Sequence, residues 1–242
     1  MTRSLRLVRL ALHLMQGMLT IAVLFPFYSP ARRNDAVKRW SQSLLNMLGV
    51  VLHVHGKIPR KRAQPAMLVA NHVSWLDIYA INAAMPVRFV AKSEVRGWPV
   101  IGWLSANTGT LFIKRARRHD TARINHEIVA AMQNGDVVAV FPEGTTSDGS
   151  RVLRFHSSLL QPALLAQARV HPVALRFERD DGSLCVDAAY CGDKSLWDTL
   201  LLILARPVIH ARVWFLEPLS DPMDRRALGE AAHRAIAGRL KS

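Results

Sequence analysis

Short apolar runs and polar turns alternate along the chain from residue 66 onward. Runs typical of buried strands occur at residues 66–70, 87–92, 110–115, 136–141 and 170–177, with further strands near 184–189 and at 208–216. Stretches typical of helices occur at residues 74–85, 120–135, 156–168, 195–205 and 222–240. This alternation predicts an α/β fold with a mostly parallel sheet flanked by helices.

The N-terminal part has a different pattern. Residues 10–29, LALHLMQGMLTIAVLFPFYS, contain no Lys, Arg, Asp or Glu and approach the ~20 residues of a bilayer-spanning helix. Residues 35–52 predict a second, more amphipathic helix. Basic residues flank the apolar segment on both sides, whereas a spanning helix usually carries them on its cytoplasmic side only. We therefore expect a helical hairpin embedded in one leaflet, with a single span as the alternative.

A stretch rich in proline and basic residues, GKIPRKRAQP at 56–65, separates this hairpin from the strand–helix alternation. The sequence thus predicts a membrane-associated two-helix element at residues 1–55 and one globular domain at residues 56–242.

The composition of the chain predicts an anionic partner. The chain carries 32 Lys and Arg against 18 Asp and Glu, a net charge of +14, which favours anionic membrane lipids or nucleic acid. Aromatic residues are few and no zinc-finger, helix-turn-helix or RNP pattern is present, so we expect lipids and no nucleic acid. Cys185 and Cys191 lack metal-ligand spacing, so we expect no metal and ordinary thiols in a reducing compartment.

A polar cluster, NHVSWLD at residues 71–77, interrupts two apolar segments. His72 follows a predicted strand, and ligands of open α/β sheets bind beyond the carboxyl ends of strands. A histidine there can act as a general base, and Asp77 can orient its ring and stabilise the imidazolium. The alternative is a capping box formed by Ser74 and Asp77, which would leave Asn71 and His72 unexplained.

A second polar loop, FPEGTTSDG at 141–149, follows the strand at 136–141. Its glycines permit a tight loop with exposed N–H groups that can hold an oxyanion, and Glu143 is expected to bring a carboxylate into the same crevice. A plain turn is the alternative. In a third segment, GTLFIKRARR at 109–118, Lys114 and Arg115 leave a buried strand and suit anion recognition.

Four segments, in this order, resemble the motif blocks of the PlsC-like lysophospholipid acyltransferases, the 1-acyl-sn-glycerol-3-phosphate acyltransferase superfamily. NHVSWLD resembles the H-x4-D block, GTLFIKR the glycerol-phosphate-binding block, FPEGT the third block and VHPVAL the proline-bearing fourth block. The resemblance covers roughly residues 60–220. The hairpin is also similar to the membrane-embedded two-helix element of bacterial members.

The resemblance implies transfer of an acyl group from acyl-CoA or acyl-carrier protein to a lysolipid hydroxyl, without a further cofactor. Lysophosphatidate is the expected acceptor, and the cytoplasmic face of the inner membrane is the expected location. His72 would remove the hydroxyl proton, Asp77 would orient His72, Arg115 would contact the anionic head group, and Glu143 and Gly144 would shape the acceptor site. The expected substrate-binding set is completed by Asn71, Ser74, Lys114, Thr145, Thr146 and Arg151.

One position departs from the family pattern. Many phosphatidate-forming members read E-G-T-R in the third block, where this chain has Thr146. Its attraction for a phosphomonoester is expected to be weaker, unless Arg151 or Arg154 compensates. The stretch EGTTSDGSRVLRFHSSLL resembles more closely members that acylate lyso-ornithine lipid, which is the second candidate acceptor.

Two functions of other classes compete with this interpretation. One is a non-catalytic, basic protein that binds membrane surfaces. The other is an esterase with Ser74 or Ser147 as the nucleophile, which the absence of a G-x-S-x-G motif disfavours.

Overall fold

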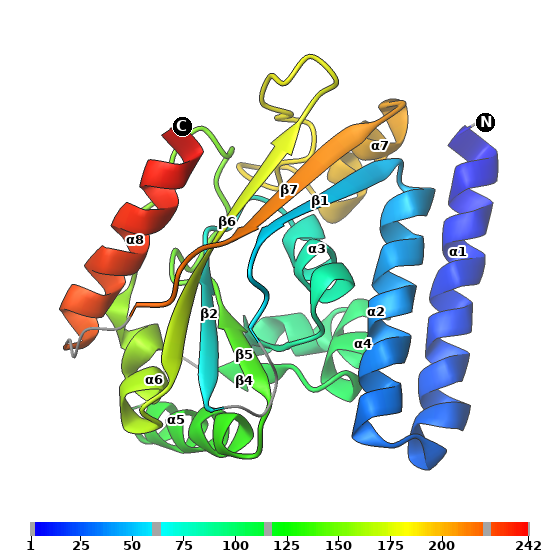
Figure 1. Cartoon of the computed structure of the whole chain (residues 1–242). Coiled ribbons are helices and arrows are strands. Elements are labelled where there is room, and N and C mark those ends of the chain that lie inside the picture. Colours follow the sequence, from blue (N-terminus) through cyan, green and yellow to red (C-terminus); the bar gives the residue numbers. More distant parts are fainter. Residues whose placement is uncertain (1–2, 60–63, 114–117, 220–223, 242) are drawn as a thin grey trace.

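The computed structural model describes residues 3–59, 64–113, 118–219 and 224–241. Its centre is a seven-stranded sheet in the order β1-β7-β6-β2-β5-β3-β4 (Figure 1). The strands are β1 (Val50–Gly56), β2 (Ala66–Ala70), β3 (Arg88–Lys92), β4 (Leu111–Ile113), β5 (Val137–Val140), β6 (Arg169–Glu178) and β7 (Ile209–Phe215). Every pairing is parallel except β6 with β7, so the predicted α/β fold with a mostly parallel sheet is confirmed.

Helices cover both faces of the sheet (Figure 1). One face packs against α2 (Pro30–Met47), α3 (Leu76–Ala84) and α7 (Leu196–Ala205). The other packs against α5 (Arg118–Gln133), α6 (Gln161–Leu165) and α8 (Arg225–Lys241). Along β2, Leu68 belongs to the first core and Met67 and Val69 to the second. Because both faces are buried, the central strands are apolar throughout rather than alternating.

The N-terminal segment forms two antiparallel helices side by side (Figure 1). The first is α1 (Arg3–Leu19), which continues through a π-helical turn, η1 (Thr20–Leu24), and a 3₁₀ turn, η2 (Phe25–Phe27). Ser29 then caps α2, whose first residue is Pro30. The stretch Ser4–Phe27 is long and apolar enough to cross a membrane, judged by length and composition.

The hairpin is fixed to itself and to the sheet domain. The ring of His13 stacks on Trp40 at 4.5 Å, and the Trp40 indole N–H donates to the His13 carbonyl. A Cβ added at Gly17 would lie 2.6 Å from the Trp40 indole nitrogen, so this close approach needs glycine. Arg6 donates to the Leu204 carbonyl at the end of α7.

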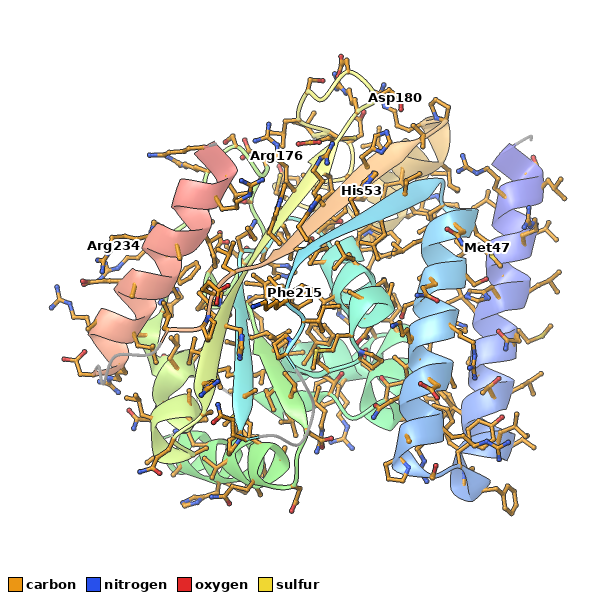
Figure 2. All side chains as sticks on the ribbon, in the orientation of Figure 1. Met47, His53, Arg176, Asp180, Phe215 and Arg234 are labelled. Atoms are coloured by element: carbon orange, nitrogen blue, oxygen red, sulfur yellow. The ribbon has the colours of Figure 1, made fainter. Side chains whose placement is uncertain are left out.

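The outer face of α1 remains apolar and exposed. Side chains of α1 project away from the sheet in Figure 2. The large apolar residues exposed along this stretch are Leu5, Val8, Leu12, Met15, Leu19, Val23, Leu24 and Phe27. Their helical spacing gives one continuous stripe, which is typical of a surface that another apolar phase covers.

Three details differ from the sequence prediction. The second helix ends at Met47 rather than at residue 52, because Gly49 takes a φ of +73° and turns the chain into β1. The strand expected near 184–189 is reduced to a single bridge between Glu178 and Leu184. Residues 93–107, left unassigned, form η3 (Ser93–Gly97) and α4 (Ile101–Asn107). The division at residues 55 and 56 stays a prediction, although the sheet already includes β1.

Candidate active site

The sheet brings two of the predicted loops together. Strands β2 and β5 are parallel neighbours, and Val69 pairs with Val140, so the chain leaves both strands at the same edge. Beyond them, Ser147 N–H donates to the His72 carbonyl (2.9 Å), and His72 N–H donates to Glu143 Oε1 (2.8 Å). The chain runs from β2 to β3 on one side of β2 in the sheet, and from the neighbouring β6 to β7 on the other side. Open α/β sheets bind ligands where the connections of neighbouring strands diverge in this way.

His72 and Asp77 form a hydrogen-bonded pair. His72 Nδ1 lies 2.7 Å from Asp77 Oδ2. The same oxygen accepts the N–H groups of Val73 (2.7 Å) and Ser74 (2.9 Å). Because a carboxylate can only accept, the proton of the neutral ring lies on Nδ1, and Nε2 keeps its lone pair.

The imidazole is held but accessible. Its ring stacks on Phe141 with centroids 4.0 Å apart, and its side chain is 20% exposed, whereas Asp77 is fully buried. Asp77 Oδ1 is buried without a hydrogen-bond partner among the described residues. In the described part of the chain, all hydrogen bonds of the Asp77 carboxylate are therefore made by Oδ2, to the His72 ring and to the backbone before α3.

The capping interpretation is also partly right. Asp77 accepts the Ser74 N–H, and the Ser74 hydroxyl accepts the Leu76 N–H (3.3 Å). The capping box is incomplete, because Asp77 N–H donates to the Ser74 carbonyl rather than to its hydroxyl and the N-cap of α3 is Trp75. The Asp77 carboxylate thus holds both the turn before α3 and the His72 ring. Asn71 has a separate structural task, because its amide exchanges two hydrogen bonds with the backbone of Leu175 and extends the pairing of β2 with β6.

Glu143 lies inside the protein rather than in the crevice. Its side chain is buried, and its two oxygens accept the N–H groups of His72 (2.8 Å) and Leu153 (3.0 Å). Burial raises the pKa of Glu143 to about 7, although the two backbone hydrogen bonds act in the opposite direction. Its carboxylate therefore holds the loop against His72, and it does not line the cavity described next.

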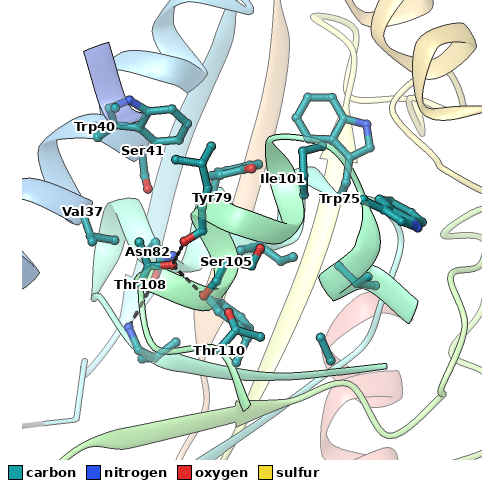
Figure 3. A pocket seen from close by; sticks show the side chains of 18 of the residues that line it. Val37, Trp40, Ser41, Trp75, Tyr79, Asn82, Ile101, Ser105, Thr108 and Thr110 are labelled. Atoms are coloured by element: carbon teal, nitrogen blue, oxygen red, sulfur yellow. Dashed lines mark hydrogen bonds between the residues drawn. The ribbon is translucent and has the colours of Figure 1, made fainter. Parts of the chain in front are cut away.

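A cavity of about 750 Å³ opens beside His72, within the size range of small-molecule sites. Both hairpin helices, α3, α4 and the loop after β5 line it. Figure 3 shows Tyr79, Asn82, Ser105 and Thr108 facing one another in this space, with Trp40 and Ile101 nearby. The walls are mainly apolar with a few polar groups, as expected for a site that holds a hydrocarbon chain next to a polar reaction centre.

The loop after β5 forms part of the cavity wall. Gly144, Thr145 and Thr146 all line it, and Gly144 has a φ of +69°. The N–H groups of Thr145 and Thr146 donate to no other group in the described part of the chain. They are therefore candidate donors to an oxyanion. The Thr146 hydroxyl donates to the Tyr190 carbonyl.

The predicted cationic residues have different positions. Arg151 is exposed and is not among the residues that line the cavity. Lys114 and Arg115 lie outside the described residues. Lys92, which the sequence reasoning missed, is exposed at the carboxyl end of β3 and lines the cavity. Its position at the end of a predicted strand, on the same edge of the sheet as His72, could have identified Lys92 as a candidate binding residue.

Other chemistries find little support in this site. Among the described residues, no group of three or more His, Cys, Asp and Glu side chains could hold a metal ion. Ser74 and Ser147 are buried, and in the described part of the chain neither hydroxyl is hydrogen-bonded to the His72 ring. The site consists of a hydrogen-bonded imidazole–carboxylate pair beside a large cavity.

Comparison with known proteins agrees with this geometry. Residues 51–176 match the acyltransferase family model. The lyso-ornithine lipid O-acyltransferase of Pseudomonas aeruginosa is 37% identical over 205 residues, which cover 84% of this chain and 78% of that protein. The 1-acyl-sn-glycerol-3-phosphate acyltransferase of Neisseria meningitidis is 36% identical over 209 residues, which cover 86% and 81%.

The fold has a counterpart among solved structures. The crystal structure of PlsC, the 1-acyl-sn-glycerophosphate acyltransferase of Thermotoga maritima, superposes with a TM-score of 0.68 at 23% identity and covers 99% of this chain and 97% of that one. The family expected from the four motifs is thus confirmed, and the chain belongs to the acyltransferase family.

Proposed function

We propose that this protein transfers an acyl group from a thioester to the hydroxyl of a lysolipid. The observation that carries the proposal is the His72–Asp77 pair at the wall of a cavity large enough for a lipid chain. The chemistry needs a base that removes the hydroxyl proton, and Nε2 of His72 is the ring nitrogen available for it.

In this mechanism the lysolipid hydroxyl approaches His72 Nε2 and attacks the thioester carbonyl carbon as its proton moves to the ring. Asp77 stabilises the imidazolium through Nδ1. In this proposal the N–H groups of Thr145 and Thr146 hold the tetrahedral oxyanion, which is supported by the position of both residues at the cavity wall. The C–S bond then breaks, the ring returns the proton to the thiolate, and no acyl-enzyme forms.

The head group of the acceptor has two candidates. Lysophosphatidate follows from the glycerol-phosphate motif, and Lys92 provides a cation at the cavity wall. Lyso-ornithine lipid is favoured by Thr146, because a hydroxyl that donates to Tyr190 stands where many phosphatidate-forming members have a guanidinium. Relatives with both printed activities are about equally similar to this chain.

The setting of the reaction is part of the proposal. The exposed apolar stripe of α1 and the positive net charge support association with an anionic membrane surface. We place the protein on the cytoplasmic face of the inner membrane, where acyl-CoA and acyl-carrier protein are the candidate donors. The cavity itself is lined by the hairpin, so the membrane element belongs to the substrate site.

The test is an acyl-transfer assay with the purified full chain, lysophosphatidate and lyso-ornithine lipid in parallel, and acyl-CoA and acyl-carrier protein as donors. His72→Ala should reduce turnover by roughly 10²–10⁴-fold, the usual contribution of a general base. His126→Ala, which changes an exposed histidine of α5, is the matched control. Unchanged turnover in His72→Ala would refute the mechanism, and absence of turnover with every acceptor and donor would favour the non-catalytic binding function.

A further inference from the structure

The segment between β3 and β4 has two contrasting faces. On its inner side, Ile101, Leu104 and Ser105 of α4 line the cavity, and Figure 3 shows Ile101 and Ser105 at its wall. Three large apolar side chains of the segment are also exposed: Trp98 (38%), which lines the cavity as well, and Val100 (38%) and Trp103 (41%), which do not line it. An element this short rarely exposes so much apolar surface without a partner.

The backbone at Val100 is strained. Val100 has φ +61° and ψ −59°, and Ile101 N–H donates to the Pro99 carbonyl across it (2.6 Å), which defines a γ-turn of the rare type. A β-branched residue with positive φ costs about 1–3 kcal/mol. Since Val100 is exposed, burial within the protein does not offset this cost. Strain that holds an apolar side chain in solvent suggests an external partner.

Charges around the segment indicate which partner fits. Lys92 and Arg96 are both exposed, and the only acidic residue between them is Glu94. The Arg96 guanidinium lies 5.8 Å from the centre of the Phe112 ring. Tryptophan side chains next to basic residues are typical of surfaces that lie at the boundary between water and anionic lipid.

The hairpin, which also lines the cavity, carries the same kind of surface. In the N-terminal helical segment, Gln16, Thr20 and Leu24 line the cavity, while Leu19 and Val23 belong to the exposed apolar stripe. Both the hairpin and the Ser93–Thr108 segment therefore face the cavity on one side and expose apolar side chains on another.

We infer that residues 98–103 form a second membrane-binding surface, which together with α1 seats both walls of the cavity in the bilayer surface. The lysolipid then enters from the membrane between the two walls, and its chain need not cross water. This inference rests on the proposed function for its purpose, but the contact itself can be measured without turnover.

The first experiment measures tryptophan fluorescence of the full chain on vesicles of phosphatidylglycerol and phosphatidylethanolamine with brominated acyl chains. Trp103→Ser should lose part of the quenching by the brominated chains. The matched control is Trp197→Ser, because Trp197 is 56% exposed on α7, which lies away from α4 in Figure 1. Equal quenching in Trp103→Ser and the parent protein, or an equal loss in Trp197→Ser, would overturn the inference.

The second experiment uses the double variant Val100→Gly/Trp103→Ser, since glycine fits the positive φ and neither side chain lines the cavity. The apparent KM for a lysolipid presented in vesicles should rise about tenfold or more, which corresponds to ~1.4 kcal/mol, while the KM for a soluble short-chain lysolipid changes less than about twofold. An equal rise with both acceptors would indicate a disturbed cavity and would overturn the inference. If the parent protein acylates neither acceptor, the proposed function fails, and the quenching result still decides the surface.

Discussion

Replacing Asp77 by asparagine removes one charge while leaving the shape of the side chain almost unchanged. In the native protein, Asp77 Oδ2 accepts hydrogen bonds from the ring Nδ1–H of His72 and from the backbone N–H groups of Val73 and Ser74. The amide of asparagine can keep all three bonds only if its oxygen takes the place of Oδ2. The two backbone donors therefore fix its orientation, and His72 keeps its proton on Nδ1.

The magnitude of the effect follows from this geometry. With the tautomer preserved, Asp77→Asn removes the attraction between a carboxylate and the imidazolium that forms during the reaction. Two charges about 4 Å apart attract by about 4 kcal/mol at an effective dielectric constant of about 20. At 1.36 kcal/mol per factor of ten, kcat should fall about a thousandfold.

The variant should still fold. The new NH₂ group takes the place of Oδ1, which is buried and has no hydrogen-bond partner in the described part of the chain. A buried donor without a partner costs about 1–3 kcal/mol, so a lower unfolding midpoint but a native circular-dichroism spectrum is expected. Loss of activity would then be separable from loss of structure.

A double-mutant cycle tests whether Asp77 acts through the imidazole. Turnover is measured for Asp77→Asn, His72→Ala and the combined variant, with the same lysolipid and thioester. Because the two residues act as a unit, Asp77→Asn should add almost nothing to the loss caused by His72→Ala. A further large loss in the combined variant would refute the proposed role of Asp77, as would near-native kcat in Asp77→Asn alone.

Three further predictions concern the rest of the site. The folded-state pKa of Glu143, about 7, is raised above the ordinary 4.5, so between these values the folded state holds a proton that the unfolded chain has lost. The free energy of unfolding should therefore fall by up to ~3 kcal/mol as the pH rises through this window and should level off above pH 7. Glu143→Gln should flatten this pH dependence. Urea midpoints at several pH values measure the dependence, and an unchanged slope in the variant would contradict the prediction. Lys92→Met should raise KM for an anionic acceptor about tenfold with little change in kcat, as steady-state kinetics will show, and Lys92→Arg should retain most of the affinity. Thr146→Arg should raise the ratio of kcat/KM for lysophosphatidate over lyso-ornithine lipid about tenfold in a competition assay, and an unchanged ratio would mean that this position does not select the head group.

Local patterns were sufficient to predict the central strands and the position of His72 at a strand end. The run at 66–70 is fully buried in β2, and a polar cluster directly after such a run must emerge at a strand end. His72 and Asp77 could therefore be paired from sequence spacing. The confirmed helix at Arg118–Gln133 was equally readable, since Gly135 adopts a positive φ of +86° where the chain turns back.

The sequence predictions that were wrong concerned features set by contacts between distant parts of the chain. The run VVLHVHG at 50–56 follows a helix and has no turn signal except Gly49, so its pairing with β7, far along the chain, was not visible locally. Residues 184–189 had the composition of a strand, but only Leu184 bridges to β6, at Glu178, and the chain then turns, with Ala188 N–H donating to the Cys185 carbonyl. The direction of the Glu143 carboxylate was likewise set by a remote donor, the N–H of Leu153.

The position of Trp40 and Gly17 at the wall of the cavity has a practical consequence for handling this protein. Removing the first 47 residues to obtain a water-soluble form would remove one wall of the cavity in which we propose that the fatty chain binds. The truncated protein would have a wider, more exposed cavity, and its preference for chain length should broaden. Solubilisation is better pursued by replacing the outward stripe of α1 with polar residues, which leaves the inward side of that helix intact.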